Sequence, residues 1–333
     1  MAIRPSPSHI ARVTRSATPQ AGRDASRRTV AVCDLGTYSG LILVARRSGH
    51  RWFSLVEERH TVDLLSDSGR DRRLHRRAFE RSARLLDRFQ TVAEQFGVIK
   101  AAVVCTSAVR EAVNRKSFVD SLREAANYPV RVLSARQEAT LSALGALIGL
   151  RPSERSTAVV DIGGGSTEVI SQDRGLTRFW LAPWGAARAT EAWKRISAQP
   201  PDQRVKSLTQ AAAIILRDIP TPDCQSYRVV GVGGTIVTLA MIHAGLSEFD
   251  PHRLHGTSLP TSWVVGTAKR LAGMNAEGIV RLIPFDPDRA RVLAAGTILW
   301  AGVLNRLAAD RVVVSVRGLR WGVAVRLAEG HRI

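Results

Sequence analysis

The chain has 333 residues, 45% hydrophobic and 23% charged, which excludes a disordered or membrane-embedded protein and leaves room for two domains. Its 48 Lys and Arg against 29 Asp and Glu give a formal net charge of +19, with arginine in large excess over lysine. This charge favours a polyanionic partner, although a GC-rich genome would produce the same arginine bias. Only 5% of the residues are aromatic and no zinc-finger spacing occurs, so nucleic acid is not the expected partner.

Two features bear on the compartment in which the chain works. Residues 1–28 are basic and lack the apolar segment of a secretory signal, so we expect a disordered basic tail, with an organellar transit peptide as the alternative. Cys33, Cys105 and Cys224 are far apart and form no CxxC pair, so neither a zinc site nor a disulfide framework is indicated. With no apolar run long enough for a membrane span, these features predict a cytoplasmic protein.

The first half after the tail is expected to form a sheet followed by strand and helix pairs. Three apolar, β-branched segments separated by glycine turns predict an antiparallel meander. Apolar residues at helical spacing predict a long helix ending at Gly97, whose basic face near 70–88 is either solvated or steers a polyanion. The expected strands are 29–36, 40–47, 51–64, 101–107 and 130–134, and the expected helices are 72–96, 108–127 and 135–150.

The second half repeats this opening. An apolar strand followed by aspartate and glycine occurs as "VCDLG" and again as "VVDIG", about 127 residues later, which indicates a weak internal duplication. A second hairpin, several helices and a strand running into a glycine loop follow. The expected strands are 156–162, 167–171, 175–183, 227–232 and 311–315, and the expected helices are 185–196, 202–219, 236–245, 261–272, 287–308 and 319–330.

The stretch "VVDIGGGSTEVI" carries the strongest chemical signal. Asp161 ends an apolar strand and is followed by glycines that permit unusual backbone conformations and close approach. Successive amides of such a loop form a concavity that binds anions. Because a carboxylate repels phosphate, the aspartate is expected to hold a hard cation such as Mg²⁺, with phosphate completing the site. The expected phosphate-binding residues of this loop are Gly163, Gly164, Gly165, Ser166 and Thr167.

Two weaker loops have the same character. In "DLGTYSG", Asp34 is followed by Gly36, Thr37 and Ser39, an arrangement that an ordinary turn also explains. In "VGVGGT", the residues Gly233, Gly234 and Thr235 join a strand to a helix, whose N-terminal amides could face a phosphate. Three such loops at strand ends favour a phosphate-binding cleft between two similar halves.

These motifs occur in the order typical of one family. "TSAVREAVN" at 106–114, "SARQEATLSALGAL" at 134–147, "VVDIGGGSTEVI" at 159–170, "WGAARATEAW" at 184–193, "VGVGGT" at 230–235 and "GLRWG" at 318–322 resemble the exopolyphosphatase and guanosine pentaphosphate phosphohydrolase (Ppx/GppA) family. The resemblance spans about residues 29–328 and implies the short, two-domain type.

The resemblance also implies an α/β fold of the actin-like (ASKHA) class, with two ribonuclease H-like domains and a catalytic cleft between them. Domain I is expected at 29–136, completed by a C-terminal helix at 318–333, and domain II at 137–317. Family habit further implies a homodimer and a Mg²⁺ or Mn²⁺ cofactor.

Residue roles carry over by position. Glu138 matches the glutamate that activates the attacking water, and Arg110 matches the arginine that grips the terminal phosphate. Asp161 matches the aspartate associated with metal and water, and Asp34 is its counterpart in the first loop. Glu168 is a further acidic residue beside the site. Without the resemblance, each has a plainer explanation: Glu138, for instance, suits the first turn of any helix.

Some neighbours of these residues depart from the family pattern. Thr37 and Tyr38 replace a serine and an asparagine in the first loop. Ala135 and Gln137 replace a glycine and a glutamate before Glu138, and Val316 stands where an aspartate is usual. The residues that carry the chemistry are retained. A slow enzyme or a nucleotide sensor is therefore compatible with the sequence.

The expected function is an exopolyphosphatase that releases terminal orthophosphate from inorganic polyphosphate by metal-assisted attack of water. Two alternatives stay open. The first is a guanosine pentaphosphate (pppGpp) 5′-phosphohydrolase, and the second is a non-catalytic sensor of an alarmone or of polyphosphate. Nucleic-acid binding is a third possibility that only the net charge of +19 motivates.

Overall fold

The computed structural model describes residues 29–64, 72–98, 100–153, 156–173, 176–219, 227–331 and 333. The chain forms two compact units, Met1–Leu133 with Val323–Ile333 (unit 1) and Ser134–Gly322 (unit 2). The sequence places the corresponding boundaries at 136/137 and 317/318, a few residues away from both. The expected tail at 1–28 and Cys224 lie outside the described residues. Within the described ranges, no helix is long and apolar enough to cross a membrane.

Unit 1 contains a five-stranded sheet with helices packed on it. The strands are β1 (Thr29–Leu35), β2 (Ser39–Ser48), β3 (Arg51–Thr61), β4 (Lys100–Cys105) and β5 (Val130–Val132), and the helices are α2 (Arg76–Gln95), α3 (Ser107–Glu111) and α4 (Arg115–Ala125). The order is β3-β2-β1-β4-β5. The first three strands form the predicted antiparallel meander, and β4 and β5 continue it in parallel. Every residue of the central strand β1 is buried.

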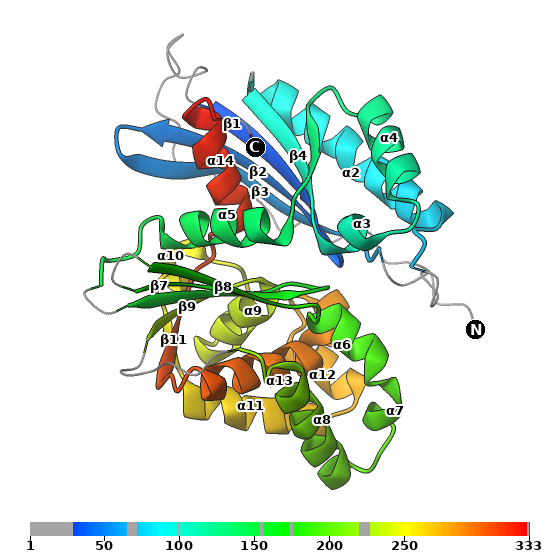
Figure 1. Cartoon of the computed structure of the whole chain (residues 1–333), viewed down its shortest axis with the longest axis vertical. Helices are drawn as coiled ribbons and strands as arrows, with labels where there is room; N and C mark the ends of the chain where they lie inside the picture. Colours follow the sequence, from blue (N-terminus) through cyan, green and yellow to red (C-terminus); the bar gives the residue numbers. More distant parts are fainter. Residues whose placement is uncertain are drawn as a thin grey trace. The chain divides into compact units, whose positions relative to one another are not determined.

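Unit 2 contains a six-stranded sheet and most of the helices. The strands are β6 (Thr157–Ile162), β7 (Thr167–Asp173), β8 (Leu176–Ala182), β9 (Arg228–Val232), β10 (Ser258–Pro260) and β11 (Arg311–Val314). The helices are α5 (Ala135–Leu147), α6 (Ala186–Ala192), α7 (Lys194–Ser197), α8 (Pro201–Ile215), α9 (Gly234–His243), α10 (Pro251–Leu254), α11 (Thr261–Gly273), α12 (Ala276–Leu282) and α13 (Ala290–Arg306). Helix α14 (Leu319–Ala328) begins in unit 2 and ends in unit 1. Figure 1 shows α8, α11 and α13 together on one side of the strands.

The two sheets share one plan. In unit 2 the order is β10-β11-β9-β6-β7-β8, with an antiparallel meander of β6, β7 and β8 and parallel additions of β9 and β11. Read from the meander edge, this matches the order in unit 1, with β10 as an extra antiparallel strand. The shared order is the one expected of ribonuclease H-like domains, and it supports the internal duplication inferred from "VCDLG" and "VVDIG".

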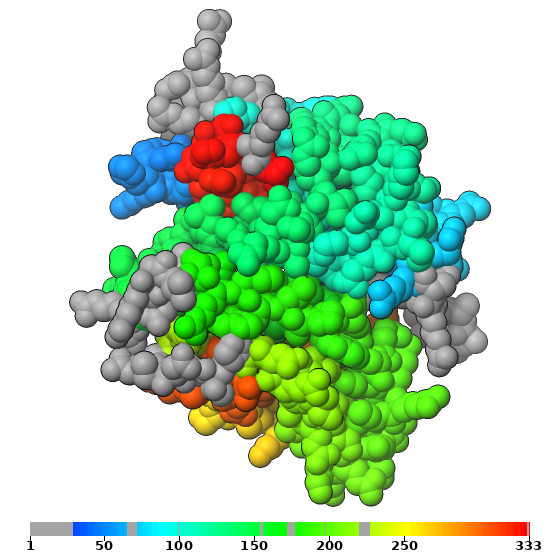
Figure 2. All heavy atoms as spheres, in the orientation of Figure 1, coloured from blue at the N-terminus to red at the C-terminus, as the bar shows by residue number. Residues whose placement is uncertain are grey.

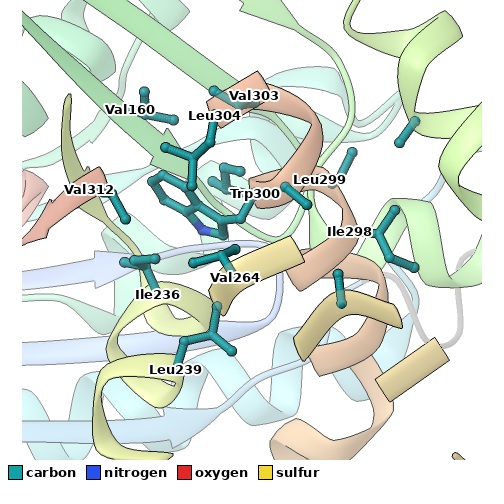
Figure 3. Close-up of a cluster of buried hydrophobic side chains, with 14 of the residues drawn as sticks. Val160, Ile236, Leu239, Val264, Ile298, Leu299, Trp300, Val303, Leu304 and Val312 are labelled. Atoms are coloured by element: carbon teal, nitrogen blue, oxygen red, sulfur yellow. The ribbon is translucent and has the colours of Figure 1, made fainter. Parts of the chain in front are cut away.

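The core of unit 2 gathers around Trp300 on α13. Figure 3 shows its indole among side chains of the sheet and of neighbouring helices, including Val160, Ile236 and Val312. Gly231 on β9 lies directly beneath the ring, and a Cβ at that position would lie 2.7 Å from the indole. The first glycine of "VGVGGT" is therefore explained by core packing, since a side chain there would displace Trp300.

The predicted long helix is α2, and it is strongly amphipathic. Leu85 and Phe89 are buried against the sheet, whereas Arg76, Arg77 and Arg84 are exposed. Figure 2 shows the start of this helix, in light blue, at the surface. The basic face predicted near 70–88 is thus solvated at these three arginines, whereas Arg81 donates to backbone carbonyls and Arg88 pairs with Glu58.

One predicted helix is interrupted. The expected helix at 108–127 is two helices, α3 and α4, because Ala112 adopts an extended conformation with ψ 134°. The side chain of Asn114 in this break accepts a hydrogen bond from the Leu74 amide at 2.9 Å and donates one to its carbonyl at 2.8 Å. A helix prediction from local periodicity cannot detect this contact, because the two residues are 40 positions apart.

Candidate active site

The triple-glycine turn of unit 2 joins β6 to β7. The Gly163 amide donates to the Ser166 carbonyl at 3.0 Å and closes the turn. The first amides of α6 donate to the carbonyls of Gly163 and Gly164 at 2.8–3.0 Å. Among the described residues, no acceptor faces the amides of Gly164, Gly165 and Ser166. The turn therefore directs carbonyls toward α6 and leaves three consecutive amides as donors, as an anion-binding loop requires.

The hydroxyl that follows this turn has a structural partner. Thr167 is 1% exposed, and its hydroxyl donates to the Trp184 carbonyl at 2.7 Å. That proton is not available to a phosphate oxygen. Close approach of the two segments also requires Gly185, because a Cβ there would lie 2.5 Å from the Gly163 carbonyl oxygen.

Asp161 lies beside this turn, on β6, where it is paired with Glu168 on β7 and Val232 on β9. Its Oδ2 accepts a hydrogen bond from the Ser142 hydroxyl of α5 at 2.7 Å. Burial raises the pKa of Asp161, and the bond from Ser142 opposes the rise. Glu168 is 2% exposed, so this part of the sheet holds two largely buried carboxyl groups.

Glu138 lies in the first turn of α5 and is 9% exposed. Ser134 caps the helix, and the Gln137 side-chain oxygen accepts a hydrogen bond from the Ser134 amide at 2.9 Å. The resulting capping box needs a side-chain acceptor at the third helical position, which glutamine supplies as well as glutamate does. The departure at Gln137 therefore leaves the local frame of Glu138 intact.

The other end of α5 is also anchored within unit 2. Gly145 lies so close to the backbone of Gly318 that no side chain fits at position 145. The Ile148 carbonyl accepts hydrogen bonds from His255 Nε2 at 3.0 Å and from Arg317 at 3.3 Å. Burial, followed by the charge of Arg317, lowers the pKa of His255 to about 4. His255 is therefore neutral near pH 7 and acts as a hydrogen-bonding residue at this contact.

The third loop connects β9 to α9. Gly233 has φ +100°, a conformation that favours glycine, and a Cβ there would lie 2.6 Å from the Ile162 carbonyl oxygen. Thr235 is 1% exposed and packs against Gly296 on α13, so its side chain faces the core. The loop can thus offer amides of the α9 N-terminus, whereas the Thr235 hydroxyl has a packing role.

Arg289 is a residue that the sequence did not single out. Its guanidinium covers Gly234 so closely that a Cβ there would overlap it. Arg289 is 8% exposed, and its Nε donates to Asp286 at 2.9 Å. In the sequence, Arg289 is marked only by Asp286 three residues before it. Because the chain contains many other arginines, this spacing does not single it out.

Unit 1 carries the remaining predicted residues. Asp34, 8% exposed, is the next-to-last residue of β1, and the Gly36 amide donates to the Ser39 carbonyl at 3.1 Å. The Thr37 hydroxyl is buried and has no hydrogen-bond partner among the described residues. Tyr38 is 6% exposed, so its ring is directed into the interior. This loop of unit 1 therefore has the Thr37 hydroxyl as a hydrogen-bond donor, where the corresponding loop of unit 2 has three backbone amides.

Arg110 lies near the end of α3 in unit 1. Its Nη1 donates to the Leu133 carbonyl at 3.0 Å, and its own carbonyl accepts from Arg115 at 3.3 Å. The first bond uses one of the five N–H groups of the guanidinium. The side chain is thus oriented by the strand end after β5.

A divalent cation such as Mg²⁺ is bound by oxygen ligands, which carboxylate side chains supply. The described residues contain no group of three or more His, Cys, Asp and Glu side chains arranged to hold a metal ion. Asp161 in unit 2 and Asp34 in unit 1 are single carboxylates at strand ends. Mg²⁺ is commonly held by one or two carboxylates while it keeps several waters and binds substrate phosphates. The residues therefore fit a Mg²⁺ ion that is bound together with phosphate, and not a closed metal centre.

Comparison with known proteins places these features in a family. The model of the Ppx/GppA phosphatase family matches residues 43–331. Exopolyphosphatase 2 of Mycobacterium tuberculosis is 29% identical over 245 residues, which cover 69% of this chain and 75% of that protein. The putative exopolyphosphatase of Haemophilus influenzae is 25% identical over 325 residues, covering 92% and 93% of the two chains.

The crystal structure of the Aquifex aeolicus member of the Ppx/GppA family has a TM-score of 0.77 at 25% identity, over 92% of this chain and 99% of that one. The predicted α/β, actin-like fold with two ribonuclease H-like domains is confirmed. The predicted family and the predicted class of enzyme are confirmed as well. The chain belongs to the Ppx/GppA phosphatase family and is a phosphoanhydride hydrolase.

Proposed function

We propose that the protein is an exopolyphosphatase that removes terminal orthophosphate from inorganic polyphosphate. The observation that carries this proposal is the triple-glycine turn, where three consecutive amides without an acceptor among the described residues follow the strand that carries Asp161. The amides suit phosphate oxygens, and the carboxylate suits a cation that phosphate brings with it. The names of the relatives as exopolyphosphatases support the same substrate.

The proposed chemistry assigns one task to each group. Glu138 accepts a proton from the water that attacks the terminal phosphorus. The amides of Gly164, Gly165 and Ser166 and the guanidinium of Arg110 bind oxygens on which charge develops. Mg²⁺ or Mn²⁺, held by Asp161 and Asp34, would supply further neutralisation of charge on the phosphate oxygens.

The observed placements modify the roles expected from sequence. Gly36 and Gly163 use their amides to close their own turns, so we assign them to loop shape and not to direct phosphate binding. We assign Thr167 and Thr235 to packing. Glu168, buried beside Asp161, would act through its neighbours.

The test begins with phosphate release from polyphosphates of several lengths, with and without Mg²⁺. Glu138→Gln should lower kcat by at least about 10²-fold while polyphosphate binding persists, because the variant lacks the base but keeps the phosphate-binding groups. Glu277→Gln is the matched control, since Glu277 also lies in the first turn of a unit 2 helix but is 84% exposed at its side chain. We expect it to behave as the wild type.

Two results would redirect the proposal. A strong preference for pppGpp over polyphosphate in steady-state phosphate release would favour the pppGpp 5′-phosphohydrolase. Binding of either ligand without turnover by the intact protein would favour a sensor. The homodimer also stays a prediction, which sedimentation of the purified protein checks.

A further inference from the structure

Ser142 makes a contact that the proposed chemistry leaves without a role. Serine and threonine inside a helix commonly donate to the carbonyl four residues earlier. In α5, Thr140 does this, toward the Arg136 carbonyl at 2.8 Å. The Ser142 hydroxyl instead leaves the helix and donates to Oδ2 of Asp161 at 2.7 Å. Ser142 is 1% exposed, so water does not compete for this bond.

The two oxygens of Asp161 consequently have different surroundings. Oδ2 is bound to the hydroxyl of α5. Oδ1 faces the turn into α9, because a Cβ at Gly233 would lie 3.4 Å from it. Gly233 has no side chain, which leaves Oδ1 beside the backbone of the third loop. The hydrogen bond from Ser142 thus determines which carboxylate oxygen is directed toward that loop.

The same helix face carries the proposed base. Glu138 and Ser142 are four residues apart, so their side chains lie on one face of α5, and both are buried. The capping box at Ser134 and the close packing at Gly145 hold this helix within unit 2. A fixed helix makes Ser142 a fixed donor, and the donor in turn restricts rotation of the Asp161 carboxylate.

We propose that Ser142 is a positioning residue that holds Asp161 in one rotamer, with Oδ1 presented to a divalent cation and its bound phosphate. The inference rests on the proposed function, in which Asp161 serves that cation. A carboxylate that is already oriented loses less rotational freedom when the cation binds. Hydrogen bonds to ligating carboxylates typically change metal affinity by about 10- to 100-fold when they are removed.

The test compares Ser142→Ala with Ser171→Ala. Ser171 on β7 is also 1% exposed in unit 2, but its hydroxyl has no hydrogen-bond partner among the described residues. Free Mn²⁺ is measured by electron paramagnetic resonance in the presence of saturating orthophosphate, and thermal melting checks the fold. Ser142→Ala should weaken Mn²⁺ binding about tenfold. It should raise the metal concentration for half-maximal hydrolysis in proportion and leave KM for polyphosphate at saturating metal unchanged.

Ser171→Ala should match the wild type in every measurement, and Ser142→Thr, which keeps the hydroxyl, should restore much of the Mn²⁺ affinity. Unchanged Mn²⁺ affinity in Ser142→Ala, equal weakening in Ser171→Ala, or absence of Mn²⁺ binding by the wild type would overturn the inference. If the wild type fails to hydrolyse polyphosphate but Ser142→Ala still weakens Mn²⁺ binding, the proposed function fails and the role of Ser142 stands.

Discussion

Units 1 and 2 place an aspartate at the same point of the same sheet, yet surround it differently. Asp34 and Asp161 are each the next-to-last residue of the strand that opens the meander. In both units the glycine two residues later closes a turn by donating to the carbonyl three residues ahead, as Gly36 does to Ser39 and Gly163 to Ser166. The shared features thus extend from topology to individual hydrogen bonds.

The difference begins at the next residues. In unit 2, the amides of α6 take the loop carbonyls, and the loop amides of Gly164, Gly165 and Ser166 stay available. In unit 1, amides of the segment after β3 take the carbonyls of Thr37 and Tyr38, and the Thr37 hydroxyl has no partner among the described residues. One sheet plan therefore supports two ways of offering donors to a phosphate, and the loop decides between them.

Removing the two carboxylates separately tests this comparison most directly. Asp161→Asn should lower kcat/KM for polyphosphate by about 10²- to 10³-fold, because Asp161 is oriented by Ser142 and adjoins the loop with available amides. Asp34→Asn should cost less. Steady-state kinetics over a range of Mg²⁺ concentrations measures both, with thermal melting as the check on folding. A larger loss for Asp34→Asn would reverse the ranking of the two loops.

The two threonines should separate stability from activity. In Thr167→Val, the Trp184 carbonyl loses its donor, so we expect a loss of about 1–3 kcal/mol in the free energy of unfolding. Thr37→Val removes no hydrogen bond to a described residue, so stability should hold while phosphate release falls. Chemical denaturation and initial rates on the same samples distinguish the variants. Equal effects of the two substitutions on both measurements would contradict the assigned roles.

Acid should destabilise the units in different pH windows. In unit 2, the pKa of His255 is lowered to about 4, so its stabilising effect is complete above about pH 6.5 and is lost as the pH falls from there through 4. In unit 1, burial acts to raise the pKa of Glu58, but hydrogen bonds from His60 and Arg88 outweigh it and bring the pKa to about 2. That contribution is present above about pH 4.5 and is lost toward pH 2.

His255→Gln should therefore flatten the pH dependence of stability between 6.5 and 4, and Glu58→Gln should flatten it between 4.5 and 2. Denaturant unfolding at a series of pH values, at constant ionic strength, measures both slopes. These are the smallest effects expected here. Slopes that stay unchanged in both variants would show that other groups govern acid unfolding.

Local pattern in the sequence was sufficient for most of the fold. Alternating and continuous apolar runs located the strands of both meanders, because a buried strand must be apolar along its length. The local pattern was less accurate where a distant residue makes a contact. Asn114 is an example, because its hydrogen bonds to Leu74 accompany the break between α3 and α4. Isolated short elements such as α10 and β10 also gave no periodic signal, since a period needs more than one turn to be detected.

The sequence by itself determined that a tight glycine turn follows the strand that carries Asp161, because residue type sets which backbone conformations are possible. The tertiary structure decided which atoms of that turn are available. Only the folded structure shows that the Gly163 amide donates to the Ser166 carbonyl and the Thr167 hydroxyl to the Trp184 carbonyl, and only the position of α5 shows that Ser142 donates to Asp161. Hydrogen bonds between segments depend on distance and direction in space, which the order of residues along the chain does not record.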